Sequence, residues 1–444
     1  MSNIYRSNRS WSQARKRSKS LKEITLYSPT KSQIILSWRK EMMKTGGLSG
    51  ARLDRLRKSM TGYVERGEVP GIVTLVSRHG EVRVDAVGNK SLDAPDPMRR
   101  DTIFRIASMS KPITAAATMT LAEEGKLRLS DAVEKWLPEL ADRKVLKRID
   151  APLDETVPAR RPITVRDLLT FTMGFGLIFT PTGEYPILSA ANNLQIGMGL
   201  ATQRQARPDP DEWIRRLGQL PLMSQPGERW LYGTGFEVLG MLIARVCGQP
   251  LETLLRERIF EPLGMKDTGF SVPADKLDRL ASCYIPNPTT GALELLDGVE
   301  ESQWGRPPIF PSGAIGLVST LDDYLAFGQM MLNQGRHGSE RILSRLSVEV
   351  MTTDQLTPQQ KAVSSLPLLP GFFDNNGWGF GVSMVTRRDD IASVPGRFGW
   401  DGSLGTSWFS DPKEDLVGIL LTQRAIPLDL YHDFWTLAYQ AIDD

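Results

Sequence analysis

Ser108 and Lys111 stand three positions apart where a helix is predicted to begin, and they are the residues most suited to chemistry in this chain. On a helix, residues at this spacing lie on one face, so the lysine amine can reach the serine hydroxyl. The helix N-terminus also favours negative charge on the serine oxygen. Such a pair can activate a serine without histidine, which matters in a chain with only 3 histidines.

Tyr232 lies directly before a second predicted helix, in the segment Trp230-Leu231-Tyr232-Gly233-Thr234. A tyrosine at such a place is either a buried anchor or a general base. The second role requires cationic neighbours that lower the pKa of the phenol. Lys111 is a candidate for that cation. The sequence leaves open whether Lys111 or Tyr232 is the base.

Residues 399–406, Gly-Trp-Asp-Gly-Ser-Leu-Gly-Thr, form the third segment of interest. Alone it is typical of a tight hairpin turn, but its glycines also let a strand edge approach a ligand closely. Two backbone N–H groups are then placed to stabilise an oxyanion, those of Ser108 and Ser403. The residues expected to bind substrate are Trp400, Asp401, Gly402 and Trp230.

In this order and spacing, the three segments resemble the motifs of the serine β-lactamase and penicillin-binding protein superfamily, in its class C-like branch. The resemblance covers roughly residues 48–440. Two motifs depart from the lactamase pattern. Tyr232-Gly233-Thr234 stands where class C lactamases have Tyr-x-Asn, and Trp400-Asp401-Gly402 stands where they have Lys-Thr-Gly. A tryptophan cannot supply the charge with which that lysine helps to hold a substrate carboxylate.

The Trp-x-Gly triplet resembles instead the family VIII carboxylesterases, which hydrolyse esters, usually with short acyl chains, on the lactamase scaffold. This resemblance implies a serine hydrolase that cleaves carboxylic esters through an acyl-Ser108 intermediate, with Lys111 and Tyr232 taking the serine proton. It implies no cofactor and a small-molecule ester as the partner. The alternatives on the same scaffold are a β-lactamase or a hydrolase of D-amino acid amides or peptides and, outside enzymes, a penicillin-binding or sensor module.

The elements that position these residues follow an α+β pattern. The resemblance implies a β-lactamase/penicillin-binding-protein-like fold, an antiparallel sheet flanked by helices with an inserted, mainly helical domain. Hydrophobic periodicity predicts a helix through Leu53, Leu56, Met60 and Val64, and a final helix over 428–442. Alternation predicts strands at 71–77, 82–88, 379–385, 406–410 and 416–422. Residues 176–212, rich in Pro, Gly and Asn, are expected to be loops over a cleft.

The predicted domains are a basic extension (1–47), a discontinuous α/β domain (48–112 and 296–444) and a mainly helical domain (113–295). Residues 1–45 contain 11 Lys and Arg against 2 Asp and Glu, a local charge of +9, so the remaining chain carries −7 of the net +2. Because the body is acidic, the extension is expected to be a disordered or loosely docked appendage. A nucleic-acid partner is therefore disfavoured.

Other classes of function lack their signatures. The 444 residues contain no apolar run of about 18, so no membrane span is expected. Cys247 and Cys283 show no metal-ligand spacing. A Ser-His-Asp triad is disfavoured, because none of the histidines lies in a catalytic-looking motif, and there is no Gly-x-Ser-x-Gly elbow. The expected location is cytoplasmic, and the oligomeric state is left open between monomer and homo-oligomer.

Overall fold

Strand pairing brings segments from both ends of the described chain into one antiparallel sheet. The computed structural model describes residues 46–178, 185–196, 207–366 and 369–444. The seven strands of the sheet follow the order β11-β12-β13-β14-β15-β1-β2. Their bounds are β1 Gly71–Arg78, β2 Glu81–Gly88, β11 Asn376–Trp378, β12 Ser383–Val385, β13 Phe398–Gly402, β14 Thr406–Asp411 and β15 Leu416–Thr422.

The predicted hairpin is formed by β1 and β2, which pair in register from Gly71 opposite Gly88 to Arg78 opposite Glu81. The turn residues His79 and Gly80 have φ angles of 50° and 80°. Positive φ at both positions is the geometry of the type I′ turn, whose twist matches that of the strands. Every residue of β1 is buried, as expected for a strand that is covered on both faces.

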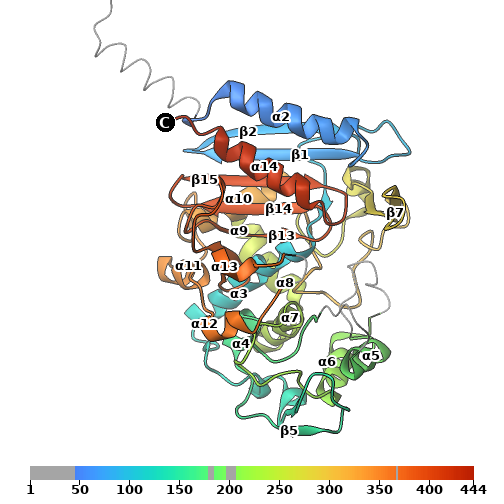
Figure 1. The fold of residues 1–444 in the computed structure, drawn as a ribbon, viewed down its shortest axis with the longest axis vertical. Helices are drawn as coiled ribbons and strands as arrows, with labels where there is room; N and C mark the ends of the chain where they lie inside the picture. Colours follow the sequence, from blue (N-terminus) through green and yellow to red (C-terminus); the bar gives the residue numbers. More distant parts are fainter. Residues whose placement is uncertain (1–45, 179–184, 197–206, 367–368) are drawn as a thin grey trace, which may run out of the picture. The chain divides into compact units, whose positions relative to one another are not determined.

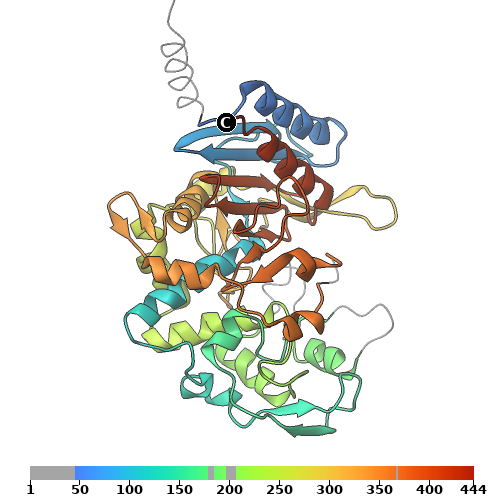
Figure 2. The same ribbon diagram turned by 60° about the vertical axis from the view of Figure 1, so that its left-hand side comes forward.

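One face of the sheet is covered by two helices from opposite ends of the described chain. These are α2 (Gly50–Glu65) and α14 (Leu428–Gln440), which lie side by side (Figures 1 and 2). Leu56 of α2 and Phe434 of α14 pack in one core with Ile72 of β1 and Leu420 of β15. The apolar residues whose spacing predicted both helices are thus the ones that the helices bury against the sheet.

The other face of the sheet packs against α10 (Leu321–Leu332). Tyr324 and Phe327 of α10 contact the Trp408 ring of β14 edge-on, with centroids 5.4 and 5.6 Å apart. The same core contains residues of α3 (Ser110–Glu123), in which every residue from Ser110 to Leu121 is buried. Because α3 is a core helix, the side chains at its start lie inside the molecule.

The remaining described body contains further helices and short strand pairs, joined by loops and turns. The other helices are α4 Val165–Leu169, α5 Pro186–Asn193, α6 Pro210–Gln219, α7 Thr234–Cys247, α8 Leu251–Leu255, a π-helical turn Arg256–Phe260, α9 Glu261–Leu263, α11 Arg345–Met351, α12 Pro358–Ala362 and α13 Phe372–Asn375. The short 3₁₀ turns are Ala107–Met109, Val133–Lys135, Pro138–Leu140 and Ala274–Arg279. The two-stranded pairs are β3 Phe104–Arg105 with β8 Val318–Ser319, β4 Lys144–Leu146 with β5 Thr156–Pro158, β6 Cys283–Pro286 with β7 Leu293–Asp297, and β9 Arg336–His337 with β10 Glu340–Arg341.

Two sequence expectations were wrong in detail. The strand expected at 379–385 is interrupted, because Gly381 has a φ of 75° and the chain turns between β11 and β12. The region 176–212, expected to be loops, contains α5 and the start of α6, while its residues 179–184 and 197–206 lie outside the described residues. Each of the two helices begins with a proline. Proline is favoured at that position, because its missing N–H would have no partner there.

The antiparallel sheet and its flanking helices confirm the predicted α+β class. The described residues from 46 onward belong to one compact unit. The boundaries drawn at 112 and 295 therefore stay a prediction. The expected basic extension, 1–47, lies outside the described residues except for Gly46 and Gly47.

Candidate active site

Ser108 lies on a single 3₁₀ turn, Ala107–Met109, between strand β3 and the start of α3. Ala107 has a φ of 42°, a left-handed conformation that is rare for a residue with a side chain. Such strained residues are concentrated at functional sites. The Nζ atom of Lys111 lies 2.9 Å from the Ser108 Oγ and 3.0 Å from the Ala314 carbonyl oxygen, and it is hydrogen-bonded to both. The pair predicted from spacing is therefore formed.

The Lys111 amine is completely buried. Loss of hydration lowers the pKa of Lys111 to about 7, and the negative charge of Glu237 opposes part of that fall. A lysine with this pKa is neutral in a large fraction of molecules near pH 7, so its lone pair can accept the proton of the serine.

Tyr232 completes a hydrogen-bonded cluster around the serine. Its hydroxyl accepts the indole N–H of Trp400 at 2.7 Å, and the Ser108 side chain lies close enough to influence the pKa of the phenol. The Lys111 Nζ lies 4.6 Å from the centroid of the Tyr232 ring. Burial raises the pKa of Tyr232, although its interactions with Ser108 and Trp400 oppose the rise. This direction is the opposite of the one that a resting phenolate base requires.

Strand β13 approaches the serine turn so closely that only glycine fits at its end. A Cβ atom on Gly402 would lie 2.4 Å from the Ile106 carbonyl oxygen. The Thr406 hydroxyl donates to the same carbonyl at 3.3 Å. Ser403, which follows Gly402, thus lies beside the segment that leads into Ser108. The oxyanion role of the Ser108 and Ser403 amide groups stays a prediction on this geometry.

Trp400 and Asp401 point to opposite faces of β13, as neighbours on a strand must. Trp400 contacts Tyr232, whereas the Asp401 carboxylate accepts from the Ser407 hydroxyl at 2.5 Å. Ser407 accepts in turn from the Trp435 indole of α14 at 2.9 Å. Burial raises the pKa of Asp401 to about 6, against the hydrogen bond from Ser407 and the charge of Arg397. The carboxylate of Asp401 is therefore not brought together with the other predicted site residues.

Trp230 is 2% exposed and lies against Tyr232, with ring centroids 5.4 Å apart and planes 34° apart. It belongs to an aromatic cluster whose members come from distant segments. Phe171 lies 4.9 Å from Tyr232, and Trp378 lies 4.7 Å from Trp400, between ring centroids. The sequence identified neither Phe171 nor Trp378 as a site residue. Trp378 is fully buried but also supports Trp400.

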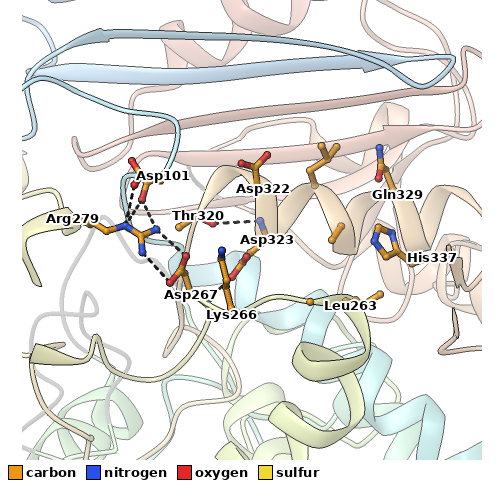
Figure 3. A pocket seen from close by; sticks show the side chains of 13 residues that line it. Asp101, Leu263, Lys266, Asp267, Arg279, Thr320, Asp322, Asp323, Gln329 and His337 are labelled. Atoms are coloured by element: carbon orange, nitrogen blue, oxygen red, sulfur yellow. Dashed lines mark hydrogen bonds and ion pairs between the residues drawn. The ribbon is translucent and has the colours of Figure 1, made fainter. Parts of the chain in front are cut away.

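A separate hollow of about 410 Å³ borders α10 (Figure 3). It contains none of the predicted site residues. Among its charged groups, Asp267 accepts from Arg279 at 2.8 Å and from Lys276, which lies outside the lining, at 2.7 Å. Asp323 accepts the Asp267 backbone N–H at 2.8 Å. This network ties α10 to the chain around Asp267, and we interpret it as structural.

Among the described residues, no group of three or more His, Cys, Asp and Glu could hold a metal ion. No single described helix is long and apolar enough to cross a membrane. Only the bent pair Thr234–Cys247 and Leu251–Leu263, with 83° between its parts, meets the criteria of length and composition.

A lysine-paired serine with a tyrosine beside it, set at the start of a core helix next to an antiparallel sheet, defines a β-lactamase-like serine site. Comparison with known proteins agrees with this class. The chain belongs to the Beta-lactamase family, whose family model matches residues 56–441. The predicted resemblance to carboxylesterases of this superfamily is confirmed by a relative that is named as an esterase.

Protein Rv1367c of Mycobacterium tuberculosis (strain ATCC 25618 / H37Rv) is 40% identical, over 85% of this chain and 92% of its own length. Esterase EstB of Burkholderia gladioli is 32% identical, over 80% of this chain and 86% of its own length. Among solved structures, EstCE1, described as a hydrolase with promiscuous acyltransferase activity, superposes with a TM-score of 0.69. It is 25% identical and covers 89% of this chain and 99% of its own.

Proposed function

We propose that this protein is a serine carboxylesterase that cleaves esters with short acyl chains through an acyl-Ser108 intermediate. The observation that carries the proposal is the 2.9 Å hydrogen bond between Ser108 and a buried Lys111 amine. The similarity to Esterase EstB supports ester cleavage over other uses of the scaffold.

In the first step, the Ser108 Oγ attacks the ester carbonyl carbon while its proton passes to the Lys111 amine. The carbonyl oxygen becomes an oxyanion, which the N–H groups of Ser108 and Ser403 stabilise. When the tetrahedral intermediate collapses, the carbon–oxygen bond to the alcohol breaks. Tyr232 protonates the departing alkoxide and regains a proton from the Lys111 ammonium. The products of this step are the free alcohol and acyl-Ser108.

In the second step, water attacks the acyl carbonyl carbon and gives its proton to the same Lys111 and Tyr232 pair. The bond from carbon to the Ser108 Oγ breaks, and the serine oxygen takes the proton back. The carboxylic acid leaves. Because Lys111 and Tyr232 exchange protons, the apparent pKa values of the reaction belong to the pair.

The surroundings of Tyr232 favour a neutral substrate. Trp400 stands where class C lactamases have the lysine of Lys-Thr-Gly, and its indole N–H donates to the Tyr232 hydroxyl. The rings of Trp378 and Phe372 lie against Trp400, with centroids 4.7 and 5.9 Å from its own. An apolar wall of this kind gives a substrate carboxylate no opposite charge, so burying that carboxylate carries a desolvation cost.

A panel of substrates tests the proposal. Rates are measured side by side on p-nitrophenyl butyrate, a chromogenic cephalosporin and a D-amino acid amide, with wild type and Ser108→Ala. We expect the ester to be turned over fastest, and Ser108→Ala to abolish that turnover. Preference for the cephalosporin or the amide would assign the protein to those hydrolases. A burst without turnover would indicate a penicillin-binding or sensor module.

A further inference from the structure

Glu237, a buried acidic residue beside the proposed site, has no part in the reaction described above. It lies in the first turn of α7 and is 1% exposed. One carboxylate oxygen accepts from the Arg207 guanidinium at 2.8 Å. Within the described part of the chain, the other oxygen has no hydrogen-bond partner. A buried carboxylate with a single partner is costly to keep, so its position calls for an explanation.

The fold connects Glu237 to Lys111 through the turn at residues 312–314. Gly240 lies one helical turn after Glu237, on the same side of α7. A Cβ atom on Gly240 would lie 3.3 Å from the Gly313 backbone, so helix and turn are in direct contact. The carbonyl oxygen of the next residue, Ala314, accepts from Lys111 at 3.0 Å. The same turn therefore contacts both α7, which carries Glu237, and the Lys111 amine.

Arg207 packs on the segment that leads into this turn. Its guanidinium carbon lies 5.4 Å from the centroid of the Phe310 ring, which stands at the start of the segment that leads to Ala314. The Arg207 side chain is 11% exposed, so little solvent screens the ion pair from its surroundings.

We propose that Glu237, held by Arg207, is a positioning residue that sets the charge state of the Lys111 amine and so the pH at which Ser108 becomes nucleophilic. The inference rests on the proposed role of Lys111 as the base for Ser108. The negative charge of Glu237 favours the ammonium form of Lys111, and burial opposes it. The balance between the two effects decides where the amine titrates.

The other groups near Lys111 leave this role to Glu237. The Lys111 amine lies over the Tyr232 ring, and the Tyr232 phenol is neutral near pH 7, because its pKa is raised. Asp401 acts on Tyr232 from the far face of β13 and is itself opposed by Arg397. Residues 379–382, whose Gly381 packs on the backbone of α3, include no ionisable side chain.

The test measures how fast a fluorophosphonate labels Ser108 as a function of pH. In this reaction the bond from Ser108 Oγ to phosphorus forms, fluoride leaves, and the serine proton passes to Lys111. The rate therefore reports the neutral amine without any ester. Mass spectrometry of the peptide that contains Ser108 follows the reaction, and thermal unfolding monitors the fold of each variant.

Glu237→Gln removes the charge and keeps an acceptor for Arg207. The midpoint of the pH profile of Ser108 labelling should therefore move to lower pH by about half a unit or more. Glu237→Asp keeps the charge and should restore the wild-type midpoint. Glu301→Gln, on the exposed surface, makes the same change in net charge and should leave the midpoint unchanged. Arg207→Gln leaves the Glu237 charge without its partner, so the midpoint should move to higher pH.

The inference is overturned if the midpoint stays at the wild-type value in both Glu237→Gln and Arg207→Gln. If only one of these variants folds, its midpoint alone decides. A lower rate with the same midpoint would mean a merely structural role and overturns it as well. If wild type is labelled at Ser108 with these shifts but hydrolyses no ester, the proposed function fails and the inference stands.

Discussion

Burial moves the pKa values of Lys111 and Tyr232 in opposite directions. It lowers the pKa of the amine to about 7 and raises that of the phenol. Near neutral pH, the amine is therefore available to take a proton and the phenol to give one. The sequence left the choice of base between the two residues open, because it shows neither the burial nor the hydrogen bonds that separate them.

The pH dependence of ester hydrolysis should follow the Lys111 amine. In the proposed mechanism Lys111 acts as a neutral base, so kcat/KM should fall as the pH drops through about 7, the pKa of Lys111. Lys111→Arg retains the charge but cannot deprotonate in this range, and we expect it to lose at least about a hundredfold in kcat. Rates between pH 5 and 9 check this, and a Lys111→Arg enzyme with near-normal kcat would place the base elsewhere.

Tyr232→Phe should lower kcat by at least about a hundredfold, the usual effect of a lost proton donor. The ring and its contacts with Trp230 and Phe171 are retained, so the melting temperature should change little. Trp400→Phe removes the N–H that Tyr232 accepts together with part of the indole ring, and should cost less in kcat. Stopped-flow hydrolysis of p-nitrophenyl butyrate measures both variants. A Tyr232→Phe enzyme as fast as wild type would exclude the tyrosine from proton transfer.

At the scale of elements, the site depends on how closely β13 approaches the serine turn. A Cβ atom at Gly402 would lie 2.2 Å from the Thr406 Oγ1 and 2.4 Å from the Ile106 carbonyl oxygen. Since one of these neighbours is backbone, β13 and the turn must separate to make room. The sequence predicted that a glycine here lets the strand edge come close to another group. It did not predict that this group is the Ile106 carbonyl.

Gly402→Ala should therefore reduce kcat strongly and destabilise the fold by about 1–3 kcal/mol, the usual cost of overpacking. Gly50→Ala, at the start of α2, is the matched control, because nothing lies within 4 Å of its added Cβ. That control should keep full activity and stability. Urea unfolding and ester hydrolysis measure the two variants. Equal free energies of unfolding and equal kcat values for Gly402→Ala and Gly50→Ala would mean that β13 and the turn move freely.

Arg105 ties the strand that leads into Ser108 to the rest of the body. Its Nε donates to the Asp297 carboxylate at 2.8 Å, and both side chains are almost fully buried. Arg105→Met would leave Asp297 buried without its cation, which should cost about 3–5 kcal/mol in the free energy of unfolding.

The matched control for that variant is Arg100→Met, which breaks an exposed ion pair with Asp322. Exposed pairs contribute at most about 1 kcal/mol. Chemical denaturation compares the two variants. A loss at Arg105 no larger than that at Arg100 would show that the buried pair contributes little to stability.

The elements that sequence predicted well are those with a strong local signal. The β1–β2 hairpin and the helices α2 and α14 follow directly from apolar spacing. The helix α5 and the start of α6 were missed, because the abundance of Pro, Gly and Asn in 176–212 was interpreted as indicating loops, although a proline stands at the start of each helix. The orientation of Asp401 was open to prediction, since alternation along a strand sends its side chain to the face opposite Trp400.

At the scale of the whole molecule, the site is assembled from segments far apart in the chain. Ser108 follows β3, Tyr232 precedes α7, and Trp400 lies in β13. Motif order could predict that these segments meet, because the family resemblance carries that arrangement. It could not predict that Phe171 and Trp378 contact Tyr232 and Trp400, or that Arg207 pairs with Glu237, because those contacts arise only from tertiary packing.

The most direct test of the central claim is to trap the acyl-enzyme. Wild type and Ser108→Ala are mixed with excess p-nitrophenyl butyrate, quenched in acid within the first turnovers, digested and analysed by mass spectrometry. We expect one butyryl group on the wild-type peptide that contains Ser108, and none on the variant. Turnover of the ester with Ser108 unmodified, or a butyryl group on another residue, would contradict an acyl-Ser108 mechanism.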